Sequence, residues 1–357
     1  MLRALDHGIL TVTDQYRRAI ERTSFDVIGV QDTGERGLNG ATLRHVVVAG
    51  GKVTVATLDT DVLDAHPSFQ FPEWVDASGN VFCRVPIAYW WRGNLPDTAD
   101  GTTPRWTMLL SATSQTKEIN GTSCTFAANP GAFKLSDAWL SQFYFGKYRG
   151  HDAGSSKIGS KAGQLHKGSV SFDNYRTYCA NNGTGYHMQS LFEWHEILAR
   201  MVVEKKTFQL FPEAIRETQP ACKWRGIEDM AYHGTVYAEW MDGIRTDASG
   251  DYEAWDQANG TYGATGQAAA IGAGESTYYS QGVVGGGIFD GLFIASTMGE
   301  NATSFIPDYS GRAADRVSRI CGSNFGSGYA NYGAFNSLFN NLSSDVGARI
   351  GSRLAKW

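Results

Sequence analysis

Histidine and cysteine are the residue types in this chain that could support catalysis or bind a transition metal. His187, His195 and His233 have no HExxH spacing, the pattern that places two zinc-binding histidines on one helix face. A surface or hydrogen-bonded side chain is therefore the favoured interpretation of each histidine. Buried free thiols, rather than a zinc site or a disulfide framework, are expected for the cysteines, because they are far apart and form no CxxC pair. There are five: Cys83, Cys124, Cys179, Cys222 and Cys321.

Carboxylates could bind a hard cation, and one acidic stretch has the oxygen ligands that calcium prefers. Its members are Asp242, Asp247, Asp251 and Asp256. The EF-hand pattern with its terminal glutamate is absent, and calcium needs about six or more placed oxygens. A solvated acidic loop is the favoured interpretation, so we expect no metal and no cofactor. The chain also lacks the Gly-x-Ser-x-Gly and GxxxxGK(S/T) motifs, and we predict no catalytic residues and no enzymatic activity.

Residues 324–344 carry no charge and alternate small residues with aromatic ones. Tyrosine, serine, glycine and asparagine are also the mixture of antibody loops, where tyrosine supplies contact area at low entropic cost. The alternative is a glycine-rich closing hairpin whose rings fill the core, and composition alone leaves both interpretations open. On the first interpretation, the receptor-binding residues are Asn324, Phe325, Ser327, Tyr329, Asn331, Tyr332, Phe335, Asn336, Asn340 and Asn341.

The overall composition narrows the classes of partner. The formal net charge is −5, charged residues make up 19% of the 357 positions, and no block of lysine and arginine occurs. Nucleic acid is therefore disfavoured as a partner. No stretch resembles the apolar core of a signal peptide, and none approaches the ~18 apolar residues of a membrane span. We expect synthesis in the cytoplasm without a signal peptide, and no membrane insertion.

Local patterns predict the elements that must position these residues. A short helix is predicted over residues 13–23, and a hairpin is predicted where Gly50 and Gly51 separate two β-prone runs. These elements suggest a small N-terminal module of residues 1–64. Further along, residues 81–91 and 102–111 are β-prone.

Two helices are predicted in the middle of the chain. The first covers residues 171–180, with Ser171 as its N-cap. The second is the most strongly patterned helix of the sequence, over residues 186–204. Within it, Ser190 and Glu193 have the spacing of a capping box, and apolar residues follow on one face.

Four stretches carry a family resemblance. Residues 76–86 read DASGNVFCRVP, residues 190–194 SLFEW, residues 224–240 WRGIEDMAYHGTVYAEW, and residues 347–354 GARIGSRL. They resemble motifs of the C-type lectin-like fold, as found in formylglycine-generating-enzyme-like domains and in the variable proteins of diversity-generating retroelements. Many of those variable proteins are bacteriophage tail-tip proteins.

The resemblance implies an α+β fold: a C-type lectin-like domain with two helices, small antiparallel sheets and long ordered loops, preceded by the β-rich N-terminal module. This domain would cover residues 65–357, with insertions at about 94–130 and 245–315. The terminal strand, about residues 348–355, would pair within the core sheet, and the residues before it would form the exposed binding face. The expected structural core comprises Trp194, Trp224, Glu239, Trp240, Arg349 and Arg353.

The resemblance also implies a function, namely binding of a host-surface receptor, protein or glycan, at the tip of a phage tail. Such a protein would be part of the virion, form a homotrimer and contact other tail proteins through residues 1–64. Two alternatives stay open. One is a structural baseplate or decoration protein without a receptor. The other is a formylglycine-generating-like oxidase, which needs two cysteines near the C-terminal core, where this chain has only Cys321.

Overall fold

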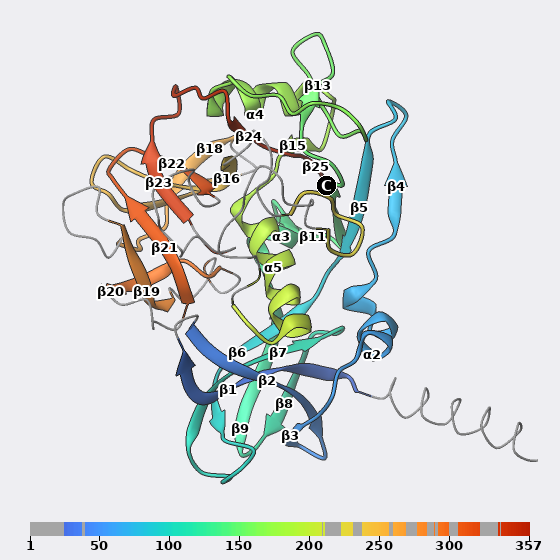
Figure 1. Ribbon diagram of the computed structural model, residues 1–357, viewed down its shortest axis with the longest axis vertical. Helices are drawn as coiled ribbons and strands as arrows, with labels where there is room; N and C mark the ends of the chain where they lie inside the picture. The colour runs from blue at the N-terminus through green and yellow to red at the C-terminus, as the bar shows by residue number, and fades with distance from the viewer. Residues whose placement is uncertain are drawn as a thin grey trace, which may run out of the picture. The chain divides into compact units, whose positions relative to one another are not determined.

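The computed structural model divides the chain into two compact units (Figure 1). Unit 1 comprises Met1–Thr33, Leu43–Gln70 and Ala88–Ala127, and unit 2 comprises Gly34–Thr42, Phe71–Ile87 and Ala128–Trp357. The structure describes residues 25–37, 40–208, 210, 223–230, 238–256, 260–268, 277–283, 289, 292–299, 306–321, 335 and 337–357. The helix predicted over residues 13–23 lies outside them.

The expected α+β fold with two helices and small sheets is wrong. Strands make up 43% of the structure and helices 16%, and a large antiparallel sheet is nearly closed. The described residues contain four α-helices, and the two largest sheets have seven and nine strands. Much of the difference arises in the expected insertions, residues 94–130 and 245–315. These segments form strands because neighbouring strands satisfy their backbone groups, which hydrophobic patterning does not reveal.

Unit 1 is built on the seven-stranded sheet, in the order β3-β2-β1-β7-β6-β9-β8. The β1–β7, β2–β3, β6–β7 and β8–β9 pairings are antiparallel. The predicted hairpin at Gly50 and Gly51 is confirmed, since Val48 pairs with Val53 across it. The strands are β1 (Val27–Gly37), β2 (Gly40–Ala49), β3 (Lys52–Val55), β6 (Tyr89–Pro96), β7 (Pro104–Ser111), β8 (Gln115–Ile119) and β9 (Thr122–Ala128).

This sheet joins the expected N-terminal module to residues that the sequence analysis assigned to an insertion. Val27 of β1 pairs with Ser111 of β7, far along the chain. Apolar side chains from both parts form one buried cluster that includes Val46, Leu109 and Phe126. Short helices α2 (Thr60–Ala65) and η1 (Pro67–Phe69) complete the unit.

Asp97 is the centre of a polar network in unit 1. Its side chain is 6% exposed and accepts hydrogen bonds from Arg44 and from Nε of Arg105, the latter at 2.8 Å. Gln31 extends the network, because its Oε1 accepts from Arg44 and its Nε2 donates to Thr107. The network thereby links the β1, β2, β6 and β7 segments of the sheet.

Unit 2 contains a five-stranded sheet, in the order β15-β25-β12-β5-β4, and a nine-stranded sheet. The first comprises β4 (Glu73–Val75), β5 (Val81–Pro86), β12 (Gln142–Gly146), β15 (Tyr186–Met188) and β25 (Leu354–Lys356). The second comprises β16 (Ala238–Thr246), β17 (Tyr252–Asp256), β18 (Thr261–Ala264), β19 (Thr277–Val283), β20 (Ala295–Gly299), β21 (Ile306–Arg312), β22 (Val317–Cys321), β23 (Ser337–Asn341) and β24 (Ile350–Gly351). Smaller pairs are β10 (Lys134–Leu135) with β11 (Ala138–Trp139), and β13 (His151–Asp152) with β14 (Ile158–Gly159).

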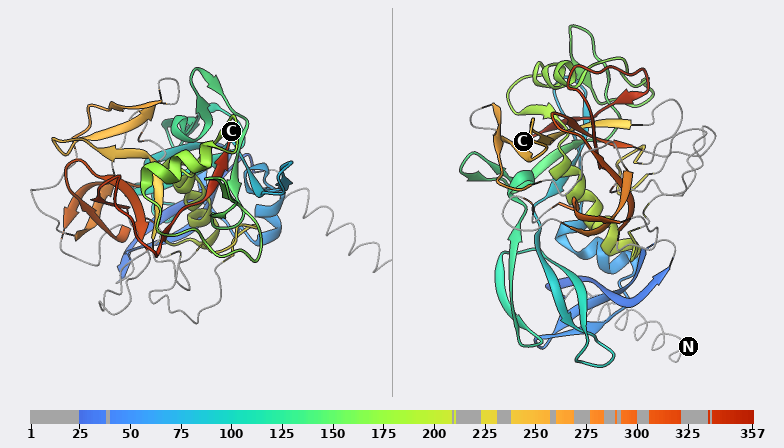
Figure 2. Two further views of the ribbon diagram at one scale, coloured as in Figure 1. Left: turned by 90° about the horizontal axis from the view of Figure 1, so that it is seen from above. Right: turned by 90° about the vertical axis from the view of Figure 1, so that its left-hand side faces the viewer.

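The single terminal strand expected over about residues 348–355 is two short strands: β24 pairs with β16 of the nine-stranded sheet, and β25 pairs within the five-stranded sheet. Strand β25 lies between β12 and β15, with Ala355 opposite both Phe145 and His187. Figure 2 shows this red strand running beside green strands from much earlier in the chain.

The helices of unit 2 are α3 (Pro130–Phe133), α4 (Phe172–Ala180) and α5 (Leu191–Lys205). The predicted N-cap Ser171 is confirmed, and so is the capping box of α5. Ser190 Oγ accepts from the Glu193 N–H at 3.1 Å, and Glu193 Oε2 accepts from the Ser190 N–H at 2.8 Å. The helix begins after Ser190 rather than at residue 186, because Tyr186–Met188 forms strand β15 beside β25.

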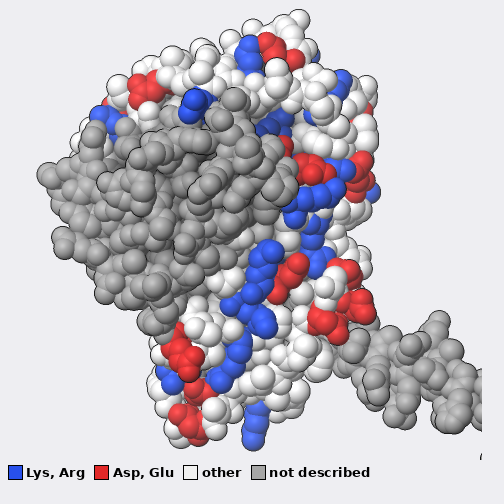
Figure 3. All heavy atoms as spheres, viewed as in Figure 1, with Lys and Arg blue, Asp and Glu red and all other residues white. Residues whose placement is uncertain are grey.

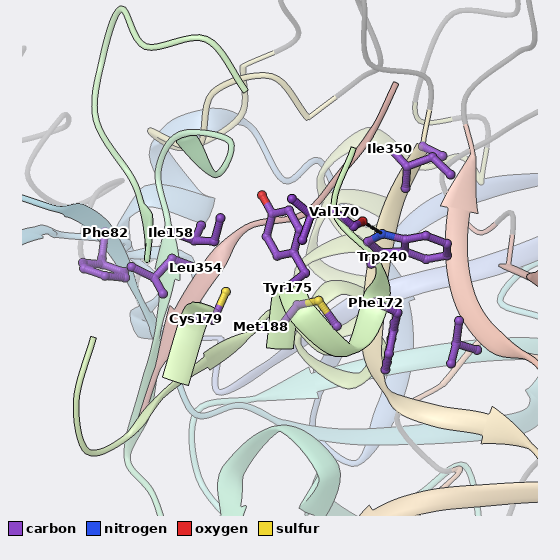
Figure 4. Close-up of a cluster of buried hydrophobic side chains, with 12 residues drawn as sticks. Phe82, Ile158, Val170, Phe172, Tyr175, Cys179, Met188, Trp240, Ile350 and Leu354 are labelled. Atoms are coloured by element: carbon purple, nitrogen blue, oxygen red, sulfur yellow. Dashed lines mark hydrogen bonds between the residues drawn. The ribbon is translucent and has the colours of Figure 1, made fainter. Parts of the chain in front are cut away.

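The core of unit 2 packs around Trp240, which is fully buried (Figure 4). Its indole Nε1 donates to the Val170 carbonyl at 3.1 Å, marked by the dashed line. Phe172 of α4 meets the indole edge to face, with ring centroids 6.1 Å apart. Within the described part of the chain, no helix is both long enough and apolar enough to cross a bilayer.

Candidate functional site

Strands β22 and β23 are hydrogen-bonded neighbours, and β22 ends just before the predicted receptor-binding segment, residues 324–344, whereas β23 lies within it. Strand β22 pairs antiparallel with β23, so that Ile320 lies opposite Ser337 and Arg319 lies opposite Leu338. Strand β22 also pairs with β16, the strand that carries Trp240. Both ends of residues 322–336 are therefore held by one sheet.

Most of the predicted receptor-binding residues cannot be placed, because they lie outside the described residues. These are Asn324, Phe325, Ser327, Tyr329, Asn331, Tyr332 and Asn336. Of the other three, Asn340 belongs to strand β23. Asn341 is half-buried, and its Nδ2 donates to Asp345 Oδ2 at 3.0 Å.

Phe335 is packed inside unit 2 rather than presented to solvent. Its side chain is 2% exposed, and its ring contacts Phe293, His195 and Phe208 at centroid distances of 4.6, 5.7 and 5.8 Å. The sequence left both roles open for the aromatic residues of this segment, and Phe335 takes the core role. It anchors the C-terminal end of the segment beside α5.

A buried ionic network surrounds Glu239 on strand β16. Glu239 accepts from Arg149 Nε and Gln189 Nε2, each at 3.0 Å, and its Oε2 lies 3.5 Å from Arg353 Nε. Burial by itself would raise the pKa of Glu239, but the guanidinium groups of Arg353 and Arg149 outweigh it, so this pKa is lowered. Both arginines also donate to the Asp229 carbonyl. The network joins four distant segments around the strand next to β22.

The expected structural-core residues mostly occupy the core. Trp194, Glu239, Trp240 and Arg353 are at most 1% exposed. Trp224 is 4% exposed, and its Nε1 donates to Glu204 at 3.1 Å. Arg349 differs, because it is exposed in the turn before β24 and therefore lies outside the core.

The two candidate histidines that the structure describes, His187 and His195, have separate partners. His187 stacks on Trp357 and its Nε2 lies 2.8 Å from Glu193 Oε1, whereas Nδ1 of His195 accepts from the Phe293 N–H. His233 lies outside the described residues. Among the residues that the structure describes, no three or more His, Cys, Asp or Glu side chains are grouped so as to hold a metal.

Among the described side chains, three cysteines are free and buried: Cys83, Cys124 and Cys179. Burial raises the pKa of the Cys83 thiol to about 12 and that of Cys124 to about 11. Protonated thiols are poor nucleophiles and poor metal ligands. Cys321 lies on strand β22, opposite Ala238, and Cys222 lies outside the described residues.

The four aspartates of the acidic stretch belong to three places: Asp242 to strand β16, Asp247 and Asp251 to the turn that follows it, and Asp256 to strand β17. Asp247 closes a turn by accepting from the Ser249 and Asp251 N–H groups, each at 2.8 Å. Asp242 pairs with Arg176, and Asp256 ends strand β17. On the described part of the face in Figure 3, basic and acidic side chains lie beside one another.

Unit 2 also contains a pocket of about 390 Å³, which the sequence did not reveal. It is lined by Arg176 of α4, Tyr186 of β15, Asp242 of β16 and Trp255 of β17, among others. These residues come from four elements, and no short motif contains them. The only local signal was the aspartate stretch, which pointed to calcium instead.

Arg176 is held in place by hydrogen bonds and by an aromatic ring of this pocket. Its Nε donates to Asp242 Oδ2 at 2.7 Å, and its Nη2 donates to Asp242 Oδ1 and to Tyr262 Oη, both at 2.6 Å. The guanidinium lies 4.0 Å from the centroid of the Trp255 ring. Burial by itself would lower the pKa of Arg176, but Asp242 outweighs it, so this pKa is raised.

In comparisons with known proteins, no family model and no curated protein matches this chain.

Proposed function

We propose that this protein is a receptor-binding protein that attaches a particle, such as a tailed phage, to the surface of its host. The receptor would bind the uncharged segment of residues 322–334. The observation that carries the proposal is the pairing of Ile320 with Ser337, which holds both ends of this segment in one sheet.

Fixed ends matter because a binding loop loses conformational entropy when it engages a partner. A loop whose ends are already closed by paired strands loses less of it, which favours tight binding. Tyr329 and Tyr332 would supply rigid contact area, and the asparagines and serines between them would supply adaptable hydrogen bonds. This division of labour is typical of binding loops carried on a rigid scaffold.

In this proposal, strand β16 and the ionic network around Glu239 form the rigid scaffold that supports the segment. Glu239 is opposite Ile320 of β22, so the network lies one strand away from the start of the segment. Assembly as a trimer would present three copies of the segment and multiply weak single-site binding. Residues 1–64 would contact other tail proteins.

The test is a double substitution, Tyr329→Ala with Tyr332→Ala, in the full chain. We expect adsorption of the labelled protein to susceptible cells to weaken about ten-fold or more, with unchanged thermal stability, because truncation of aromatic anchors removes most of the binding energy. Trp139→Ala is the matched control, since Trp139 is a 55% exposed aromatic residue on β11. Unchanged adsorption of the double variant, or a protein that assembles into particles but binds no cells, would contradict the proposal and favour a structural role.

A further inference from the structure

Several aromatic side chains contribute to the lining of the pocket in unit 2. Tyr186, Trp255 and Trp357 line it, and Phe192 of α5, which is 2% exposed, forms part of its lining. A volume of about 390 Å³ lies in the range of small-molecule sites. Phe335, the described residue at the C-terminal end of the proposed receptor-binding segment, is not among the described residues that line the pocket.

Two glycines allow the backbone to approach the Phe192 ring. A Cβ added at Gly131 would lie 2.2 Å from the ring, and one added at Gly243 would lie 2.9 Å from it. Gly243 also has φ +95°, a conformation that other residues rarely adopt. A side chain at either position would force the ring or the backbone to shift. The position of the Phe192 ring in the lining therefore depends on both glycines.

One wall is fixed by stacking. The His187 and Trp357 rings are nearly parallel, with centroids 3.4 Å apart. His187 is in turn held by Glu193, whose second oxygen belongs to the capping box of α5. A wall that is already ordered loses little entropy when a ligand packs against it.

Arg176 offers hydrogen-bond donors in a fixed direction. Its Nε and Nη2 are occupied by Asp242 and Tyr262, and no described residue accepts from its Nη1. The two N–H groups of Nη1 therefore remain for a ligand, on a side chain that is 22% exposed and held on Trp255.

The charge of the pocket is balanced. Asp242 compensates Arg176 through two hydrogen bonds, and at the rim the exposed Lys134 and Asp256 have opposite signs. A free anion would therefore gain less here than at an uncompensated arginine. A neutral ligand with hydroxyl oxygens can accept from Nη1 without displacing Asp242.

We propose that this pocket binds one neutral sugar ring. A pyranose has an apolar C–H face, which can pack on Trp255, Trp357 or Tyr186, and a rim of hydroxyl groups, which can accept from Arg176 Nη1. The pairing of aromatic surfaces with a few fixed polar groups is the general pattern of small-ligand sites.

The test titrates the full chain with glucose, galactose, mannose and N-acetylglucosamine, using calorimetry. Inorganic phosphate and N-acetylneuraminic acid serve as anionic probes. Ala180→Trp is the blocking variant, because Ala180 is exposed at the last position of α4 and lines the pocket. Asn174→Trp is the matched control, on the same helix, exposed and outside the lining.

We expect at least one neutral sugar to bind, Ala180→Trp to weaken that binding about ten-fold or more, and Asn174→Trp to bind like the unmodified protein. If Ala180→Trp does not fold, as judged by thermal melting, Trp255→Leu replaces it with the same expectation. Binding of no probe, binding of the anions alone, or sugar binding unaffected by the blocking variant would overturn the proposal. The Tyr329→Ala, Tyr332→Ala variant should titrate normally, which separates this site from receptor binding.

Discussion

Each unit contains a carboxylate that pairs with two arginines, and the two networks differ in how far their arginines are buried. In unit 1, Asp97 pairs with Arg44 and Arg105, whose side chains are 21% and 27% exposed. A glutamine, Gln31, completes the network. Its arginines thus keep part of their contact with water.

In unit 2, the corresponding carboxylate is Glu239, with Arg149 and Arg353 as its arginines and Gln189 as its glutamine. Here the arginine side chains are 8% and 0% exposed. A partly solvated pair can fall back on water when a partner is lost, whereas a fully buried pair leaves an uncompensated charge. The comparison teaches that the burial of the arginines, rather than the types of residue, decides how much each network contributes to stability.

The largest effect is expected for Glu239→Gln. It removes the carboxylate charge that lies between the two buried arginines, and we expect the free energy of unfolding of unit 2 to fall by about 3–5 kcal/mol. Chemical denaturation, with hydrogen exchange of the β16 and β22 amides, measures the loss. The control is Glu253→Gln on neighbouring β17, whose partner Arg245 is 38% exposed, and which should lose about 1 kcal/mol or less. Equal losses would remove the distinction between buried and exposed pairs.

A smaller loss is expected for Asp97→Asn in unit 1. The variant keeps its size but weakens the hydrogen bonds from two arginines that retain access to water, and we expect about 1–3 kcal/mol. Hydrogen exchange of the β6 and β7 amides reports this unit. A loss as large as that of Glu239→Gln would contradict the expectation that the more deeply buried network contributes more to stability.

Lowering the pH should reveal how much the Asp97 carboxylate contributes to the unfolding free energy. Burial alone would raise its pKa, but hydrogen bonds from the Ala99 N–H, Arg105 and Arg44 lower it from 3.8 to about 2. The stabilisation is present in full above pH 3.8 and is lost as the pH falls toward 2. The unfolding free energy, measured from about pH 5 to about pH 2, should therefore fall less steeply in Asp97→Asn than in the unmodified protein. Parallel curves would show that this carboxylate does not stabilise the fold through its charge.

The smallest effect is expected at the helix caps. Ser190→Ala removes the acceptor of the Glu193 N–H in a buried capping box, and we expect a loss of about 1 kcal/mol. Asp59→Ala in unit 1 removes the acceptor of the Val62 N–H from the short helix α2, and we expect a loss of about 0.5–1 kcal/mol. Thermal melting of both variants measures the two losses. A larger loss of stability for Asp59→Ala than for Ser190→Ala would contradict the expectation that the buried cap in unit 2 contributes more.

Local elements were predictable because their signals lie within a few residues. The Gly50-Gly51 hairpin, the Ser171 cap and the Ser190–Glu193 capping box were all correct. The helix start at residue 186 was wrong, because pairing with β25, from the far end of the chain, makes Tyr186–Met188 a strand. A long-range partner can override a local preference in this way.

The fold class was not predictable from these signals. It depends on pairings such as Val27 with Ser111, and on strands formed by polar segments that have no apolar period. The sugar pocket was hidden for the same reason, since Gly131, Arg176 and Trp255 belong to no common motif.

The sequence by itself determined the hairpin turn, the helix caps and the chemical character of the uncharged segment, since each depends on residues close together in the chain. Only the tertiary structure decided that Phe335 is buried, that Glu239 rather than another acid lies between Arg149 and Arg353, and that Arg176 lines a pocket. The physical reason is that burial and the desolvation of charge are set by neighbours from distant parts of the chain.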